Sequence, residues 1–226
     1  MSPSPSPLQA PPHILSLLDR LHTLSSTQEA AIDDRALAQA DFDAAMRDKF
    51  IALDQDKCHF MYQLVRATGA THVVEAGTSF GVSTIYLALA VGQNVKAAGG
   101  GKGVVIATEK ESTKAAIARD HWKQAGESVT DFIDLREGDL LQTLKSDLPQ
   151  IDMLLLDIWV PMALPTLQVV LPNLRPGAVV LIDNTISLAS PYAELLAYLR
   201  APESPFTNLT LPYSNGFEMC VYHPSL

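Results

Sequence analysis

A chain of 226 residues with 47% hydrophobic content can bury one substantial core, so a single domain is expected. The net charge of −9 argues against a dedicated nucleic-acid binder, which usually has a basic face. No apolar run has transmembrane length, and no signal peptide is visible at the N-terminus. Cys58 and Cys220 lie far apart and are interpreted as reduced thiols, which predicts a cytoplasmic protein with no membrane contact.

The N-terminal part is predicted to be a disordered, Ser/Pro-rich tail (residues 1–12) followed by helices (residues 13–69). Apolar residues at helical spacing predict a first helix from His13 to Leu24. The capping-box pattern that starts at Ser26 and ends at Glu29 predicts the start of a second helix. A third helix is expected over residues 52–68. These helices could cover a sheet, line a substrate pocket or make a dimer contact.

Residues 70–226 alternate between strand and helix patterns, which predicts a doubly wound α/β sheet that is mostly parallel. The expected strands are 71–75, 103–108, 132–136, 151–156 and 178–182. The expected helices are 80–91, 112–124, 140–144, 163–174 and 191–200, and residues 93–102 are expected to form a Gly-rich surface loop.

The C-terminal pattern is different, because two strand patterns, 206–211 and 217–222, follow each other without a helix. The segment between them contains Asn215-Gly216, which is a strong hairpin signal. The sheet is therefore expected to finish with an antiparallel strand.

The first strand pattern runs into a glycine turn and a helix, through the segment from Val73 to Thr84. Gly77 would let the chain turn and let a ligand touch bare backbone, and the helix would then aim free N–H groups at that ligand. In an open α/β sheet ligands bind at the carboxyl ends of the strands, so this turn is the expected floor of a cofactor site.

The spacing of this turn favours one cofactor over another. Dinucleotide folds use G-x-G-x-x-G, whereas here Thr78 and Ser79 stand between Gly77 and Gly81. Glu75 ends the strand, and an acid there repels phosphate but suits an ammonium or sulfonium group. The pattern therefore favours S-adenosylmethionine (SAM), with an ordinary structural glycine turn as the alternative.

Acids also end the next two strands. Glu109 is placed to accept hydrogen bonds from a ribose diol, or it is a solvated residue at a helix start. In Glu137-Gly138-Asp139 the glycine allows close backbone approach, and Asp139 could reach an adenine amino group. The alternative is that Asp139 caps a helix.

Asp157 ends the fourth strand, and Asp183-Asn184 ends the fifth. If these strands are neighbours, two carboxylates and an amide oxygen converge in a ligand set suited to Mg²⁺ or Ca²⁺. The alternative is that Asp157 caps a helix while the other two shape a loop. Trp159 would stand at the rim of the same cleft and could wall the pocket with its flat ring.

Together these residues resemble the SAM-dependent O-methyltransferases of the catechol and caffeoyl-CoA type, from about Leu53 to the C-terminus. The resemblance implies the class I methyltransferase fold, with a seven-stranded sheet, an antiparallel last strand and extra N-terminal helices. It also implies a homodimer. By this resemblance the SAM contacts are Glu75, Gly77, Thr78, Ser79, Gly81, Ser83, Glu109, Gly138, Asp139, Leu140 and Asp157. Asp157 and Trp159 stand where the catechol enzymes have an Asp and a Trp at the catalytic site, and Asp157, Asp183 and Asn184 match the metal ligands.

Two departures concern the acceptor. The family usually has a general-base lysine three residues after the first metal ligand, and that position is Val160 here. A glutamate that holds the second hydroxyl of catechol has no counterpart in the segment 208–210. The resulting hypothesis is methyl transfer to the hydroxyl of a small, mostly apolar phenol, with metal assistance. The alternatives are metal-independent N-methylation, a protein that binds SAM without catalysis, and an oxidoreductase on a similar sheet, which the missing middle glycine disfavours.

Overall fold

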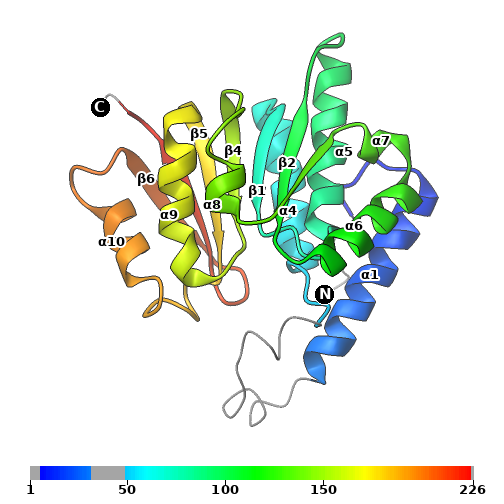
Figure 1. The fold of residues 1–226 in the computed structure, drawn as a ribbon, viewed down its shortest axis with the longest axis horizontal. Coiled ribbons are helices and arrows are strands. Elements are labelled where there is room, and N and C mark those ends of the chain that lie inside the picture. The colour runs from blue at the N-terminus through cyan, green and yellow to red at the C-terminus, as the bar shows by residue number, and fades with distance from the viewer. Residues whose placement is uncertain (1–5, 32–48, 225–226) are drawn as a thin grey trace.

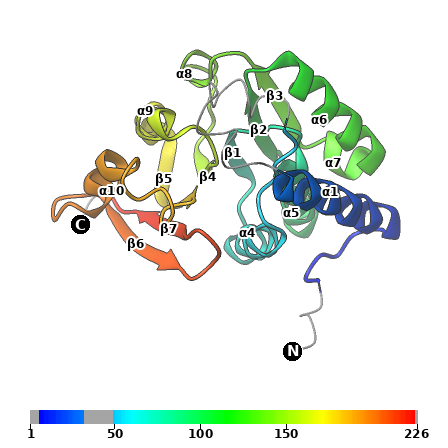
Figure 2. The same ribbon diagram turned by 90° about the horizontal axis from the view of Figure 1, so that it is seen from below.

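The computed structural model describes residues 6–31 and 49–224, which form a seven-stranded sheet covered by helices on both faces (Figures 1 and 2). The order of strands across the sheet is β3-β2-β1-β4-β5-β7-β6. The strands are β1 (His72–Ala76), β2 (Val104–Glu109), β3 (Ile133–Glu137), β4 (Ile151–Leu156), β5 (Leu174–Asp183), β6 (Phe206–Leu211) and β7 (Phe217–Tyr222). The longer helices are α1 (Pro12–Ala30), α4 (Gln55–Thr68), α5 (Val82–Ala97), α6 (Ser112–Ala125), α9 (Val160–Val170) and α10 (Ala193–Arg200). The short ones are α7 (Glu127–Thr130), α8 (Leu140–Thr143) and the 3₁₀ turn η1 (Leu171–Asn173).

The strands read as continuous apolar runs because both faces of the sheet are buried. Neighbouring residues of β1 show this, since Val73 belongs to one core cluster and Val74 to the other. The first cluster lies under α1, α4, α5 and α6, and the second lies under α9 and α10. Figure 2 shows α4 and α5 on one side of the sheet and α9 and α10 on the other. The predicted doubly wound fold is confirmed.

The predicted hairpin is also confirmed, with the strand boundaries that the sequence indicates. β7 pairs with β6 and with β5, antiparallel to both, so it is inserted between them. Asn215 (φ 61°) and Gly216 (φ 83°) both take the left-handed conformation that a tight hairpin turn requires.

The predicted break between the first two helices is wrong, because α1 continues through the capping-box residues to Ala30. Ser25, just before this pattern, is buried inside α1, and its hydroxyl accepts a hydrogen bond from the amide of Ala52. The Thr27 hydroxyl donates to the carbonyl of Thr23 one turn earlier, which allows it to sit inside a helix. The rest of the predicted second helix lies outside the described residues.

The predicted surface loop 93–102 is wrong over its first half, because α5 begins at Val82 and continues to Ala97. Packing holds these extra turns. The buried Asn94 side chain donates to the carbonyls of Val65 and Ala70, which ties α5 to the end of α4. Gly92 is accommodated because its missing side chain leaves room for the ring of Phe132.

Smaller differences concern other element ends. α4 begins at Gln55 rather than at residue 52, and β5 begins at Leu174, four residues before the predicted start. α9 begins at Val160 rather than at residue 163, since Pro161 stands in its first turn, where a missing N–H costs nothing. α5 and α10 each begin two residues later than predicted. α7 was not predicted.

Across residues 6–31 and 49–224, no helix is both long and apolar enough to cross a bilayer. Cys58 and Cys220 are both buried free thiols, as the sequence predicts.

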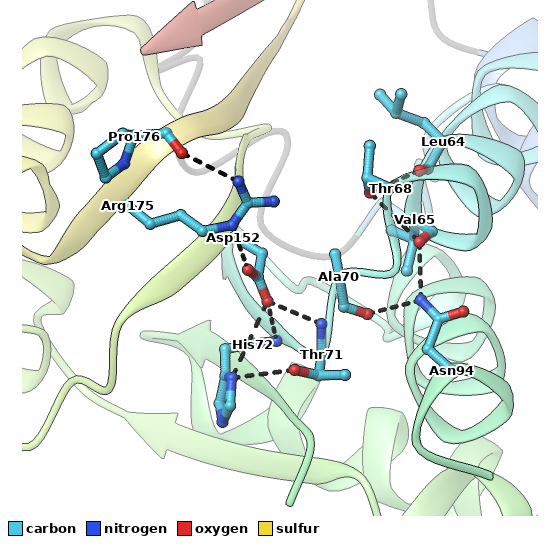
Figure 3. A network of polar contacts seen from close by, with 10 residues as sticks. All are labelled: Leu64, Val65, Thr68, Ala70, Thr71, His72, Asn94, Asp152, Arg175 and Pro176. Carbon is cyan, nitrogen blue, oxygen red and sulfur yellow. Dashed lines mark hydrogen bonds and ion pairs between the residues drawn. The ribbon is translucent and has the colours of Figure 1, made fainter. Parts of the chain in front are cut away.

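A polar network joins the amino ends of β1, β4 and β5, at the edge of the sheet opposite the predicted site (Figure 3). One oxygen of Asp152 accepts the backbone amides of Thr71 and His72 at 2.8 and 2.9 Å. The other accepts the Arg175 Nε at 2.6 Å. Burial alone would raise the pKa of Asp152, but these hydrogen bonds outweigh it and lower the pKa.

Replacing this carboxylate, in Asp152→Asn, is expected to lower the free energy of unfolding by about 2 kcal/mol at pH 7, because a charged acceptor of three donors becomes a neutral one. Urea unfolding measures the difference. Asp134→Asn is the control, since its ion pair with Arg136 is exposed on the aspartate side and is expected to contribute less than about 0.5 kcal/mol. Equal losses in the two variants would show that the network adds no stability.

Candidate active site

The carboxyl ends of the parallel strands bring most of the predicted site residues to one edge of the sheet. β1 lies between β2 and β4, and β4 lies beside β5. Glu75 therefore stands between the end of β2, which carries Glu109, and the end of β4, which precedes Asp157. The strands that end in Asp157 and Asp183 are neighbours, as the metal-site hypothesis requires.

The Glu75 side chain is fully buried, and three hydroxyl groups hold its carboxylate. Ser83 donates to one oxygen at 2.6 Å. Thr78 and Thr84 donate to the other at 2.8 and 2.5 Å. Burial raises the pKa of Glu75, and the three hydroxyl hydrogen bonds oppose that rise. Glu75 therefore fixes the turn and the first helical residues around itself.

The glycine turn owes its shape to packing between strands. Gly77 has φ +95°, and a Cβ at this position would lie 2.0 Å from the backbone oxygen of Asp157. The position that a Cβ would take at Gly77 is thus filled by the start of the loop after β4, and the contact of a ligand with the Gly77 backbone stays a prediction. Gly81, at φ +78°, is the N-cap residue before α5, and its carbonyl accepts a hydrogen bond from the indole of Trp122 at 2.9 Å.

A small cleft, with a volume of about 10 Å³, lies beside this turn and brings residues of three segments together. Its lining from the glycine segment is Gly77, Thr78, Ser79, Phe80, Val82 and Ser83. Asp157 lines it from the end of β4, and residues 51–53 line it from the segment before α4. The cleft therefore brings together five of the predicted cofactor residues, Gly77, Thr78, Ser79, Ser83 and Asp157, whereas Glu75 and Gly81 do not line it. The contribution of residues 51–53 was not predicted.

The remaining predicted cofactor residues lie at the ends of β2 and β3, which are joined by a hydrogen bond from the Gly138 amide to the Glu109 carbonyl. The Glu109 carboxylate accepts the amide of Glu111 at 2.8 Å. The Asp139 side chain accepts the amide of Leu141 and caps α8, which is the alternative that the sequence left open. Leu140 begins α8 and is partly buried.

The acid at the end of β5, Asp183, forms an ion pair with a lysine. One oxygen of Asp183 accepts the ammonium of Lys57 at 2.6 Å, and the other accepts the side-chain amide of Asn184 at 2.9 Å. Lys57 makes a second ion pair with Asp54 at 2.9 Å. Lys57 is 1% exposed and Asp183 is 6% exposed, so this pair is buried.

The protonation of these groups follows from burial and from each other. Burial raises the pKa of Asp157 well above its usual value, and the neighbouring Asp183 and Glu75 raise it further. Burial also raises the pKa of Asp183, although Lys57 opposes the rise. Burial would lower the pKa of Lys57, but its bonds to Asp183 and Asp54 outweigh burial and raise it.

The donor types fit a hard cation, but their arrangement does not. Both oxygens of Asp183 already accept hydrogen bonds, and Asn184 turns its amide nitrogen toward Asp183. Over the described part of the chain, no cluster of three or more His, Cys, Asp or Glu side chains is arranged to hold a metal ion. The predicted Mg²⁺ or Ca²⁺ site is therefore not supported.

Lys57 is not among the residues that the sequence patterns single out, although a signal for it exists. The buried residues of α4 are Lys57, Cys58, Met61, Tyr62 and Val65, which follow the helical period. A lysine on the buried face of an amphipathic helix needs an acidic partner, and that partner is Asp183, 126 residues away in sequence.

Trp159 and Val160 lie at the start of α9, shortly after Asp157. Trp159 is 47% exposed, which is unusual for a large apolar side chain. Val160 is the first residue of α9, is partly buried, and packs against the second core cluster. Where the resemblance leads one to expect a lysine, the chain therefore has an aliphatic side chain that packs on the core.

Comparisons with known proteins agree with this geometry. Residues 74–185 match the family described as a methyltransferase domain. A catechol O-methyltransferase from Niastella koreensis is 28% identical over 158 residues, which cover 68% of this chain and 67% of that protein. A catechol O-methyltransferase from Mycobacterium tuberculosis is 32% identical over 157 residues, which cover 68% of this chain and 66% of that protein. The chain thus aligns with about two thirds of the length of these relatives.

The fold is also that of solved methyltransferases. The crystal structure of an O-methyltransferase from Bacillus cereus in complex with SAH superimposes with a TM-score of 0.63, at 23% identity, and covers 89% of this chain and 99% of that chain. The chain belongs to the family of SAM-dependent O-methyltransferases.

Proposed function

We propose that this protein transfers the methyl group of SAM to a hydroxyl of a small, mostly apolar acceptor, most simply a phenol. The observation that carries the proposal is the shared cleft, in which Thr78, Ser79 and Ser83 lie with Asp157. The turn residues belong to the segment that would hold the cofactor. Asp157 stands at the strand end beside Asp183, where an acceptor would lie.

In this proposal Glu75 acts through its neighbours. Its carboxylate is buried, so it positions Thr78 and Ser83, and these line the cleft in which the methionine end of SAM would sit. Glu109 would accept the ribose hydroxyls, and Gly138, Asp139 and Leu140 would border the adenine.

The chemistry asks mainly for alignment, because the sulfonium already activates the methyl group for in-line displacement. Holding two reactants in line can lower the barrier by several kcal/mol, with ~7 kcal/mol or more in well-oriented systems. Trp159 would offer a flat apolar wall to the acceptor. Because Val160 replaces the usual lysine, a phenol suits the site, since it loses its proton more readily than an alcohol does. No step is assigned to a metal ion.

The first experiment is calorimetric titration with S-adenosylhomocysteine (SAH), the product of methyl transfer. We expect Glu109→Ala to weaken SAH binding about 100-fold, because the ribose diol loses a charged acceptor. Glu137→Ala is the matched control, since Glu137 stands opposite Glu109 at the end of the neighbouring strand and pairs with Arg119 at the surface. We expect this control to bind within about threefold of wild type.

Absence of SAH binding by the wild type would refute the cofactor assignment. With binding established, a panel of phenols and amines with methyl-labelled SAM tests the acceptor. Transfer to amines alone would replace the proposed hydroxyl acceptor, and transfer to neither class would leave a protein that only binds the cofactor.

A further inference from the structure

We propose that the Lys57 ammonium supplies the positive charge at the acceptor end of the site, and that it prevents divalent metal ions from binding to Asp183. Only the assignment of this end of the site to the acceptor rests on the proposed function. Its geometry stands on the ion pairs of Lys57 with Asp183 and Asp54.

The Lys57 ammonium and the Asn184 amide occupy both oxygens of Asp183. The ammonium nitrogen lies 2.6 Å from one oxygen of Asp183, and the side-chain amide of Asn184 lies 2.9 Å from the other. A magnesium ion would need to stand about 2.1 Å from one of these oxygens. It would then either displace a hydrogen-bond donor or share an oxygen with a positive charge a few ångströms away.

Burial and a second ion pair hold the Lys57 side chain in this position. It lies on the buried face of α4 and is 1% exposed. A second ion pair, with Asp54 one turn earlier, holds the same nitrogen at 2.9 Å, and the ring of Phe217 lies 6.0 Å away. Movement of the ammonium away from this position would leave the buried Asp183 without its counter-ion.

Two further acids, Asp157 and Asp54, surround the ion pair of Lys57 and Asp183. Asp157 and Asp54 both interact with Asp183 and with Lys57 through their charges. Such a group of acids needs a cation near it. Lys57 supplies one from within the chain, so Asp183 stays oriented beside Asp157 without an added ion. Lys57 is thus a positioning residue, which acts through Asp183.

The test is calorimetric titration of Mg²⁺ into the SAH-saturated protein. We expect no binding by the wild type at millimolar Mg²⁺. Lys57→Met removes the charge and keeps an unbranched side chain, and we expect its affinity for Mg²⁺ to be at least about tenfold higher than that of the wild type. Lys57→Arg keeps the charge and should remain without Mg²⁺ binding. Lys123→Met, near the end of α6, removes a lysine away from the pair and should behave as wild type.

Because Lys57→Met leaves a buried carboxylate, the double variant Lys57→Met/Asp183→Asn provides a neutral pair that folds without a counter-ion. It should bind SAH as the wild type does and should lose the Mg²⁺ binding that the single variant gains. Micromolar Mg²⁺ binding by the wild type, abolished by Asp183→Asn, would overturn the proposal. Unchanged Mg²⁺ affinity in a folded Lys57→Met protein would also overturn it. SAH binding is read separately, so failure of the cofactor assignment is distinguished from failure of this inference.

Discussion

Gly77→Ala adds a single methyl group and is expected to lower the free energy of unfolding by at least about 4 kcal/mol. The new Cβ would lie 2.0 Å from the Asp157 backbone oxygen and 2.5 Å from the Ile158 side chain. Backbone is on the receiving side, so the clash cannot be relieved by rotating a side chain. Thermal unfolding should show a lower melting temperature, on the order of 10 °C.

The control for this substitution is Gly99→Ala. Gly99 also has a positive φ, +83°, but nothing lies within 4 Å of the position where its Cβ would stand. It carries the conformational cost of a left-handed alanine, about 1 kcal/mol, without the clash. If Gly77→Ala melts no lower than Gly99→Ala, the contact between the turn and the loop after β4 does not constrain the site.

Acidification from pH 7 to pH 4 is expected to cost the protein up to about 3 kcal/mol of stability through His22 alone. Burial, together with the neighbouring His59, lowers the pKa of His22 to about 4, although Asp19 and Asp54 oppose the change. The His22 Nε2 lies 2.9 Å from the hydroxyl of Tyr86, a fully buried side chain.

The sign follows from proton binding. The unfolded chain takes up a proton at His22 near pH 6.5, whereas the folded protein resists it until about pH 4. This part of the stability is therefore fully present above pH 6.5 and is lost as the pH falls through that window. Asp157 and Asp183 act in the opposite direction, because their pKa values are raised in the folded state.

The measurement is therefore a difference. Urea unfolding of wild type and His22→Gln at several pH values removes the shared contribution of the carboxylates, since both proteins contain them. Glutamine keeps a polar group near Tyr86 and does not titrate. We expect the wild type to lose up to about 3 kcal/mol relative to His22→Gln between pH 7 and pH 4. Parallel pH curves for the two proteins would contradict the assignment.

Elements with strong local signals were predictable from sequence. The strands β6 and β7 match their predicted bounds, because Asn215-Gly216 marks the turn and apolar residues mark each strand. The sheet was predictable because buried parallel strands are continuous apolar runs. The acids at the carboxyl ends of β1, β2, β4 and β5 were predicted together because the ends of parallel strands share one edge. The roles of Glu75, Glu109 and Asp157 as ligands of SAM stay predictions, and so does a homodimer.

Helix ends were predicted less well where packing overrides the local signal. The capping pattern at Ser26 predicts a helix start, but Ser25 is used to hold the segment before α4, and α1 continues. The Gly-rich stretch 93–102 predicts a loop, but Asn94 ties the helix to α4, and α5 continues to Ala97. In both cases partners distant in sequence decide the outcome.

The sequence by itself determined the family, the sheet and the edge of the sheet at which the acidic residues gather, because these depend on local periodicity and on motifs of adjacent residues. Only the tertiary structure decided what those acids contact. Asp183 meets Lys57 because α4 packs beside the end of β5, and the 126 residues between them hide that contact from any local pattern. Burial makes this ion pair necessary, because a buried carboxylate or ammonium without a counter-ion would cost several kcal/mol of desolvation free energy.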